Sequence, residues 1–331
     1  LSNEKLADIM NMKAIISDRK RGINMEEIKK RILYPKPLKA GNQICLIDPA
    51  NAYTEEAIEA VSSYWKGRGF QVICAPEMAF KRGTPKERAA KLNKVFADEE
   101  NKAVMCIWGG YGTMTLLDYL DYEMIRERKP VFTGFSDITA LHLAIGQKTG
   151  LVTFHGGAVY GRTRTITEDA KEAVYQSVTT PVRGKAFSNF NGEPFHIYKE
   201  GIGEGILTGG NLTLLSRLTG TPYEVDTRGK ILFFEEIGEK PYRLHGMLTQ
   251  LKMAGKFEEV KGIIVGDLSG CDTKDRPGTA LEAVKEVLED VKCPVIYGVR
   301  AGHIGDSMTL PLHARVRIEA VEEYGVQFRA I

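Results

Sequence analysis

Residues 130–140 contain the serine best placed for chemistry. An apolar run ends at Gly134, Ser136 follows, and a helical pattern begins immediately afterwards. A strand, a sharp turn and a helix in this order raise a serine hydroxyl above a sheet edge, where N–H groups at the helix start can hold an oxyanion. The segment therefore predicts a nucleophile at Ser136. A second interpretation stays open, in which Ser136 or Asp137 caps the helix, because Ile138 stands where a nucleophile elbow usually has a small residue.

A nucleophilic serine needs a base, and the chain has six histidines. His303 is favoured because it lies in a glycine-flanked loop between predicted strands, where functional side chains are often displayed. His155 ends a strand and is a second candidate near the site, whereas His142 is expected to line the interior face of a helix. The other three are expected at helix, turn or irregular positions: His196, His245 and His313.

The base in turn needs an orienting group, which can be a carboxylate. Phe233 and Phe234 lead directly into Glu235 and Glu236, so that a very apolar strand ends in two acids. Successive strand side chains face opposite sides, and only one of the two acids can point into a shared cleft. The simpler interpretation, that both acids only mark the end of a strand, is equally open.

Two glycine-rich stretches follow or precede predicted elements. Trp108 leads into the glycine turn 109–112 at the end of a strand, and residues 208–212 form a similar predicted loop at a helix start. Glycines there allow backbone N–H groups to approach a ligand. Neither stretch matches a dinucleotide fingerprint or a phosphate loop, and no HExxH motif occurs. We therefore expect no cofactor and no metal.

Composition is that of an ordinary globular protein. The 331 residues are 43% hydrophobic and 27% charged, and the formal net charge is only +2. This balance argues against a nucleic-acid partner, and no apolar stretch is long enough to cross a bilayer. The five cysteines form no CxxC pair, which fits a reducing compartment. We expect a cytoplasmic protein, although the start at Leu1 leaves a removed export signal open.

Strand and helix patterns alternate from residue 43 onward, which predicts βαβ units and a mostly parallel sheet. In the first half the expected strands lie at 44–48, 71–75, 103–107, 131–134 and 152–154, with helices near 55–66 and 137–147. In the second half the expected strands lie at 230–234, 262–266, 295–297, 308–310, 315–318 and 326–330, with helices near 208–218, 242–254 and 280–288.

The fold class is therefore predicted as α/β. We expect an N-terminal domain with a mostly parallel sheet flanked by helices, and a smaller mixed α+β C-terminal domain. Residues 1–40 are predicted as a helical appendage and residues 41–165 as the domain that carries the serine. Residues 166–205 are predicted as a connection, because regularity fades there, and residues 206–331 as the C-terminal domain.

Taken together, these segments resemble the serine LD-carboxypeptidase family, which also includes the microcin immunity peptidases. The resemblance runs from about Leu38 to Leu312. The matching motifs are Gly109-Gly-Tyr-Gly112, Gly134-Phe-Ser-Asp-Ile-Thr139, Thr153-Phe-His-Gly156, Gly209-Gly-Asn-Leu212, Gly220-Thr-Pro-Tyr223, Leu232-Phe-Phe-Glu235 and Gly302-His303. Each motif alone is weak, but their joint order and spacing are specific.

The resemblance implies roles for particular residues. Ser136 matches the family nucleophile, Glu235 its acid and His303 its base, with the active site between the two domains. The backbone amides of Asp137 and Gly110 match the oxyanion hole. The substrate-binding positions are expected at Trp108, Gly109, Tyr111, Gly210 and Asn211.

Several positions depart from the family pattern and bear on specificity. Trp108 replaces an Arg, Phe135 a Tyr and Gly157 a Pro. His245 and Gly246 replace an Asp-Arg pair, and His313 replaces a Gly. Since Trp108 cannot form a bidentate pair with a carboxylate, we expect the substrate carboxylate to meet amides near Asn211 or a cation from elsewhere.

The predicted function is metal-independent hydrolysis of the L,D amide bond that releases the terminal D-alanine of a murein tetrapeptide. One alternative is a microcin-immunity-type peptidase that acts on aminoacyl-nucleotide amides, whose relatives often carry Asn where this chain has Gly112. The other is a non-catalytic peptide-binding protein on the same scaffold. A peptide is the expected partner, without nucleic acid or membrane, and a homodimer stays open.

Overall fold

The first of two sheets has six strands. The computed structural model describes residues 32–75, 78–80, 82–161 and 164–331, and the predicted helices of residues 1–31 lie outside it. The sheet order is β11-β5-β4-β3-β1-β2, and five strands are parallel. Their bounds are β1 Gln43–Ile47, β2 Gln71–Ala75, β3 Asn101–Cys106, β4 Val131–Gly134 and β5 Thr153–His155. The sixth, β11 (Leu310–Leu312), comes from the far end of the chain and pairs antiparallel with β5.

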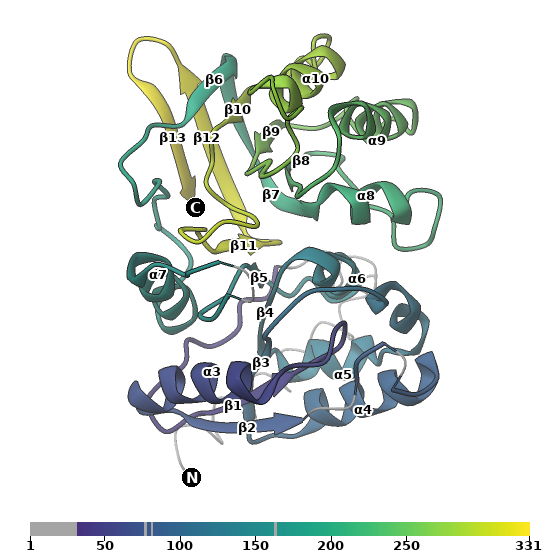
Figure 1. The fold of residues 1–331 in the computed structure, drawn as a ribbon, viewed down its shortest axis with the longest axis vertical. Coiled ribbons are helices and arrows are strands. Elements are labelled where there is room, and N and C mark those ends of the chain that lie inside the picture. The colour runs from purple at the N-terminus through teal and green to yellow at the C-terminus, as the bar shows by residue number, and fades with distance from the viewer. Residues whose placement is uncertain (1–31, 76–77, 81, 162–163) are drawn as a thin grey trace, which may run out of the picture.

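Helices cover both faces of this sheet (Figure 1). They are α3 Glu55–Gly67, α4 Pro85–Ala97, α5 Tyr122–Arg128, α6 Thr139–Thr149 and α7 Glu168–Thr179, with short 3₁₀ helices η1 Thr113–Tyr119 and η2 Ser136–Ile138. Thr54 caps α3 as predicted, because its hydroxyl accepts the Ala57 N–H at 3.2 Å. Thr84 and Glu87 form a reciprocal capping box at the start of α4.

The second sheet has seven strands in the order β13-β12-β7-β8-β9-β10-β6. The bounds are β6 His196–Lys199, β7 Gly201–Asn211, β8 Lys230–Glu235, β9 Gly262–Val265, β10 Val295–Tyr297, β12 Arg315–Val321 and β13 Gly325–Ala330. The central strands β7 to β10 are parallel, and the outer pairings are antiparallel. Helices α8 Leu212–Leu218, α9 Pro241–Met253 and α10 Thr279–Val287 lie along one side of this sheet (Figure 1).

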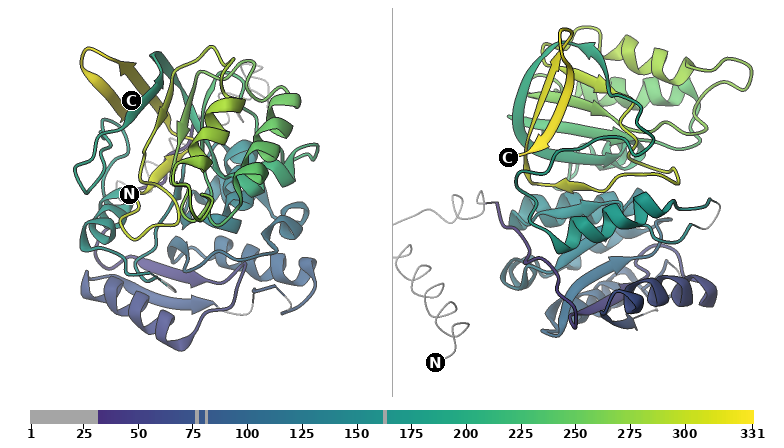
Figure 2. Two further views of the ribbon diagram at one scale, coloured as in Figure 1. Left: turned by 45° about the horizontal axis from the view of Figure 1, so that its top comes forward. Right: turned by 90° about the vertical axis from the view of Figure 1, so that its left-hand side faces the viewer.

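The two sheets form two layers, with β11 at the boundary between them (Figures 1 and 2). Two buried apolar clusters each run through both layers. One contains Phe132 of β4 together with Phe234 of β8 and Leu248 of α9, and the other contains Trp65 of α3 together with Phe233 of β8. The layers therefore share their cores, and residues from both can be held in one site. The predicted α/β class is confirmed.

Some elements differ from the expectation. The stretch 166–205, predicted as a connection, contains the helix α7 and the strand β6. Gly209 and Gly210 belong to the end of β7 rather than to a loop. Leu33, in the predicted appendage, pairs with Leu151 and so packs on the first sheet. The domain boundaries inferred from the sequence stay predictions.

Candidate active site

Ser136 lies in a strained turn at the carboxyl end of β4. Its φ is +62°, in the left-handed region that non-glycine residues rarely adopt, and such strain costs about 1–3 kcal/mol. The turn is close: a Cβ built on Gly134 would lie 2.6 Å from Cγ2 of Ile138. Gly134 therefore provides the room that the larger Ile138 needs, which explains how the turn tolerates this residue.

The expectation that Ser136 or Asp137 caps the following helix is wrong. No side chain caps η2 or α6. Asp137 is buried, and its carboxylate instead accepts the Thr113 N–H at 2.9 Å, while the Thr113 hydroxyl donates to the Asp137 carbonyl at 2.6 Å. These bonds tie the serine turn to the segment after the glycine turn 109–112. The strained backbone at Ser136 is thus not explained by helix capping.

The glycine turn after β3 lies directly against Ser136. A Cβ built on Gly109 would be 2.5 Å from the Ser136 Cβ, and one built on Gly110 would be 2.3 Å from the Asn51 side chain. Gly110 has φ +139° and is exposed, as is Tyr111, whose ring meets Phe80 edge to face at 4.9 Å. The turn therefore brings backbone close to the serine, and Gly110 and Tyr111 are exposed on its outer side.

Glu235 and His303 meet across the carboxyl ends of the second sheet. Glu235 ends β8, and its Oε2 lies 2.7 Å from Nδ1 of His303, in the loop after β10. Glu235 is fully buried, and burial raises the pKa of its carboxyl, while the His303 ring opposes that shift. A carboxylate on Nδ1 leaves Nε2 of His303 as the nitrogen that can take a proton.

The Glu235–His303 pair reaches the serine turn through Phe135. The Phe135 ring meets the His303 ring edge to face, with 5.1 Å between centroids, and Phe135 immediately precedes Ser136. Among the described residues no hydrogen bond joins Ser136 to His303. The structure therefore brings the three predicted residues to one region and forms one of the two hydrogen bonds that a triad requires.

Glu236 faces away from Glu235, as the alternation of strand side chains predicts. Its carboxylate accepts N–H groups from Asn211 Nδ2 at 3.0 Å, Thr213 at 2.8 Å and Ile237 at 2.9 Å. Asn211 is buried, and its own N–H donates to the Thr139 hydroxyl at 2.9 Å. Asn211 therefore uses its backbone N–H and one N–H of its side-chain amide inside the protein, and its expected contact with substrate stays a prediction.

Gly210 is likewise a packing residue. It has φ +139°, and a Cβ there would lie 2.5 Å from Oγ1 of Thr139 on α6. Gly210 is buried, and its expected contact with substrate stays a prediction. Its small size instead allows the end of β7 to approach the helix that follows the serine.

The remaining histidines are mostly structural. His142 is buried, and its nitrogens contact the Thr153 hydroxyl and the Gly134 carbonyl, both at 2.8 Å. Because a carbonyl only accepts, Nε2 carries the proton, and burial lowers the pKa of His142 to about 4. His196 is exposed and stacks on Tyr297. His155 is buried at the end of β5, close to Glu235.

Arg164 is a residue of the site that the sequence analysis missed. Its guanidinium carbon lies 5.5 Å from the Phe135 ring centroid, and it lines a small cavity beside Phe135 and Gly302. Burial lowers the pKa of the Arg164 guanidinium, and the charges of Glu235 and Asp267 oppose the shift. Arg164 lies in an irregular stretch without a motif, so no sequence signal identified it. Trp108 is half-buried nearby, with its ring 6.5 Å from Tyr160.

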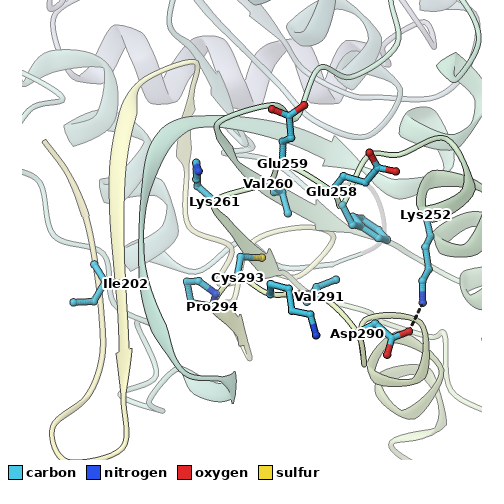
Figure 3. Close-up of a pocket in the computed structure, with 12 residues that line it drawn as sticks. Ile202, Lys252, Glu258, Glu259, Val260, Lys261, Asp290, Val291, Cys293 and Pro294 are labelled. Carbon is cyan, nitrogen blue, oxygen red and sulfur yellow. Dashed lines mark hydrogen bonds and ion pairs between the residues drawn. The ribbon is translucent and has the colours of Figure 1, made fainter.

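A cavity away from these residues lies at the other end of the second sheet (Figure 3). It measures about 570 Å³, and its lining includes Lys261, Pro294 and the ion pair Lys252–Asp290 at 3.2 Å. These residues precede β9 and β10 or end the helices before them, at the amino ends of the parallel strands. Ligand sites of such sheets lie at the carboxyl ends, which is where Ser136, Glu235 and His303 are found.

Neither a cluster of metal-ligating side chains nor a membrane-spanning helix occurs among the described residues. Across residues 32–75, 78–80, 82–161 and 164–331, no group of three or more His, Cys, Asp or Glu side chains could hold a metal ion. In the same part of the chain, every helix is too short or too polar to cross a bilayer.

A two-layer α/β fold with a strained serine and a buried Glu–His pair defines a class of hydrolases that use a serine nucleophile. Family comparison agrees with this class. Residues 44–156 match the LD-carboxypeptidase N-terminal domain, and residues 204–318 match the LD-carboxypeptidase C-terminal domain. The chain belongs to the LD-carboxypeptidase family, a family of carboxypeptidases.

Individual relatives support the assignment. A probable murein peptide carboxypeptidase of Bacillus subtilis (strain 168) is 34% identical over 305 residues, which cover 88% of this chain and 93% of the relative. The crystal structure of muramoyltetrapeptide carboxypeptidase from Oxalobacter formigenes is similar with a TM-score of 0.75 and 26% identity, covering 87% of this chain and 98% of that one. The microcin C7 self-immunity protein MccF, solved in complex with aspartyl sulfamoyl adenosine, is also similar, with a TM-score of 0.80 and 25% identity. The match covers 90% of this chain and 98% of that one.

Proposed function

We propose that Ser136, His303 and Glu235 act as a catalytic triad in a metal-independent LD-carboxypeptidase. The observation that carries the proposal is the 2.7 Å contact between Glu235 Oε2 and His303 Nδ1 beside a serine held at φ +62°. In this mechanism His303 Nε2 takes the Ser136 proton as the hydroxyl attacks, and later donates a proton to the leaving amine. Catalytic hydrogen bonds often tighten only when substrate binds, which fits the open Ser136–His303 contact.

The oxyanion is assigned to the backbone amides of Asp137 and Gly110. A Cβ built on Gly109 would lie 2.5 Å from the Ser136 Cβ, and this close approach supports the placement of the turn beside the reacting carbon. Fixed N–H donors of this kind stabilise the negative oxygen of a tetrahedral intermediate. On the same reasoning the exposed Tyr111 and the half-buried Trp108 and Gly109 line the path of the substrate body.

The substrate carboxylate is assigned to Arg164, because Asn211 and Gly210 are engaged in packing. Arg164 lies above Phe135, the residue before the nucleophile, and its Nε is buried without a hydrogen bond to a described residue. A guanidinium can bind a carboxylate with two parallel hydrogen bonds, which neutral donors cannot match in strength. A carboxypeptidase needs a cation close to its nucleophile to hold the free carboxylate beside the scissile bond, and the position of Arg164 next to Phe135 supports this assignment.

The proposed substrate is a murein tetrapeptide that loses its terminal D-alanine, a step in peptidoglycan recycling. The relatives named for murein peptides and muramoyltetrapeptides support this choice. All five cysteines are free thiols, which fits the proposed cytoplasmic location.

One observation bears on the alternative microcin-immunity-type activity. Gly112 has φ +104°, and a Cβ there would lie 2.6 Å from Cδ2 of Phe80. The Asn that such relatives often carry at this position would therefore need Phe80 to move. This favours the peptide substrate over an aminoacyl-nucleotide amide.

The test is to incubate the protein with a murein tetrapeptide and a matched carboxyl-amidated peptide, each with EDTA. We expect the free acid to be cleaved with release of D-alanine, at a rate that EDTA does not change, and the amidated peptide to stay intact without release of D-alanine amide. The variant Arg164→Gln should raise the KM for the free acid without creating activity on the amide. Hydrolysis that needs added zinc, or equal cleavage of both peptides, would contradict the proposal.

A further inference from the structure

A group of buried polar atoms lies behind the Glu235 carboxylate. Oε1 of Glu235, both ring nitrogens of His155 and the hydroxyls of Thr133 and Thr309 have no hydrogen-bond partner among the described residues. Buried polar groups in proteins are nearly always hydrogen-bonded, so several together call for a reason. They lie close to one another: a Cβ built on Gly157 would be 2.9 Å from the Thr133 hydroxyl, and His155 directly precedes this glycine pair.

The two oxygens of Glu235 face two different histidines. Oε2 contacts His303 Nδ1 at 2.7 Å, and Oε1 lies 3.9 Å from His155 Nε2. The second distance is longer than a hydrogen bond, and closing it to about 3 Å needs a ring movement of less than about 1 Å. An ionised carboxylate can only accept, so the neutral His155 ring is expected to carry its proton on Nε2 and to face Oε1 with it.

The strands fix His155 in this position. It pairs with Gly134 of β4 on one side and with Leu310 of β11 on the other. Its ring packs on Phe233 at 5.1 Å, and its side chain is only 1% exposed. The ring therefore has no room to turn toward solvent, and Glu235 is the charged group nearest to it.

Three ionisable groups face this ring: Glu235 from β8, His142 from α6 at 6.1 Å between ring centroids, and His303 from the loop after β10. The charges of Arg164 and Glu236 act in turn on Glu235. Burial, with His142 and His303 as further causes, holds the pKa of His155 well below its ordinary value. A neutral donor suits a carboxylate that must keep its negative charge for His303.

We propose that His155 is a positioning residue whose Nε2–H holds Oε1 of Glu235 while Oε2 orients His303. The inference rests on the proposed triad but not on the identity of the substrate. It predicts two effects of losing the donor. The Glu235 carboxylate should take up a proton more readily, since a hydrogen bond to the ionised form is gone, and His303 should be less well oriented.

The experiment compares His155→Leu, which removes the donor, with His155→Gln, which keeps an N–H. His196→Leu, at an exposed histidine of β6, is the control. The first readout is the rate at which a fluorophosphonate labels Ser136 as a function of pH, since this reports activation of the serine without any peptide. The second is the downfield proton resonance of His303 Nδ1–H. The third is kcat and KM on the tetrapeptide.

We expect His155→Leu to slow labelling and kcat by about 10- to 100-fold, the range for one hydrogen bond to a charged group, with KM nearly unchanged. The acidic limb of the labelling profile should move to higher pH and the downfield resonance should weaken. His155→Gln should keep most of the rate and the wild-type profile, and His196→Leu should match wild type.

The inference is overturned if His155→Leu keeps the wild-type pH profile and resonance, or if Leu and Gln lose activity equally with a lower unfolding temperature, which indicates packing alone. A failure of the proposed function looks different. In that case Ser136 is labelled and the variants behave as expected, but no D-alanine is released from the tetrapeptide.

Discussion

The two sheets contribute to the site by different means. The first sheet acts through its backbone: Ser136 is held at φ +62°, with Gly109 so close that a Cβ would lie 2.5 Å from the serine. The second sheet acts through side chains: Glu235 is buried and contacts His303 at 2.7 Å. Around Ser136, in the first sheet's half of the site, substitutions that add volume should therefore lower activity most. Around Glu235 and His303, in the second sheet's half of the site, substitutions that change a charge should lower activity most.

The largest expected effect comes from removing the nucleophile. Ser136→Ala should lower kcat on the tetrapeptide by on the order of 10⁶-fold, leaving only the catalysis that the oxyanion donors and binding provide. The measurement is D-alanine release in EDTA, with binding of the uncleaved peptide as the control for folding. A variant that keeps more than about a hundredth of the wild-type rate would make another residue the nucleophile.

The second-largest effect is expected from removing the charge of Glu235 in the second sheet. Glu235→Gln keeps the shape but removes the charge, and kcat should fall by about 10⁴-fold with KM little changed. Glu236→Gln is the matched comparison, since Glu236 holds N–H groups of Asn211 and Thr213 rather than His303. It should lower stability more than it lowers kcat. The reverse result would exchange the roles of the two acids.

A smaller effect is expected from adding volume at Gly109, beside Ser136 in the first sheet. Gly109→Ala should lower kcat by on the order of 10²-fold, because the added methyl must displace the serine by a fraction of an ångström or more. Gly67→Ala, at the end of α3 where nothing lies within 4 Å of the new Cβ, is the matched control and should leave activity unchanged. Equal rates for both variants would show that the turn tolerates volume.

The smallest effect is on stability against pH. Burial lowers the pKa of His142 to about 4 and of His313 to about 3, from an ordinary 6.5. Below pH 6.5 these histidines are protonated in the unfolded chain but stay neutral in the folded chain. The free energy of unfolding should therefore fall as pH drops from 6.5 toward 5, by up to about 1.4 kcal/mol per pH unit for each histidine. Urea unfolding at several pH values should show that the free energy of unfolding depends less on pH in His313→Gly than in the wild type. The exposed His196→Gln should keep the wild-type pH dependence.

Much of the fold could be predicted because its strands are apolar and bounded by glycine or proline. β1, β2, β4 and β8 lie within a residue or two of their predicted positions. The helix α4 was missed although its capping box, Thr84 and Glu87, was legible in the sequence. β11 could not be assigned to the first sheet, because pairing between distant segments leaves no local pattern.

The residues of the site likewise fall into those with a local sequence signal and those that depend on how distant segments pack. Ser136 has a local signal in its strand and turn, and the glycine-flanked loop favoured His303, whereas the family resemblance was needed to choose Glu235 over Glu236. Arg164 and the place of His155 beside Glu235 depend on how β4, β5 and β11 pair, which no spacing reveals. Asn211 shows the converse: it lies in a family motif, yet its amide is used by Glu236.

A double-variant cycle shows most directly whether Ser136 of the first sheet and His303 of the second act as one catalytic unit. The rates of D-alanine release by Ser136→Ala, His303→Ala and the double variant are compared with wild type. If serine and histidine form one catalytic unit, the double variant is no slower than either single variant, since either loss alone removes the whole contribution. If the fold-loss in rate of the double variant instead equals the product of the two single fold-losses, serine and histidine act independently, and a shared catalytic unit is contradicted.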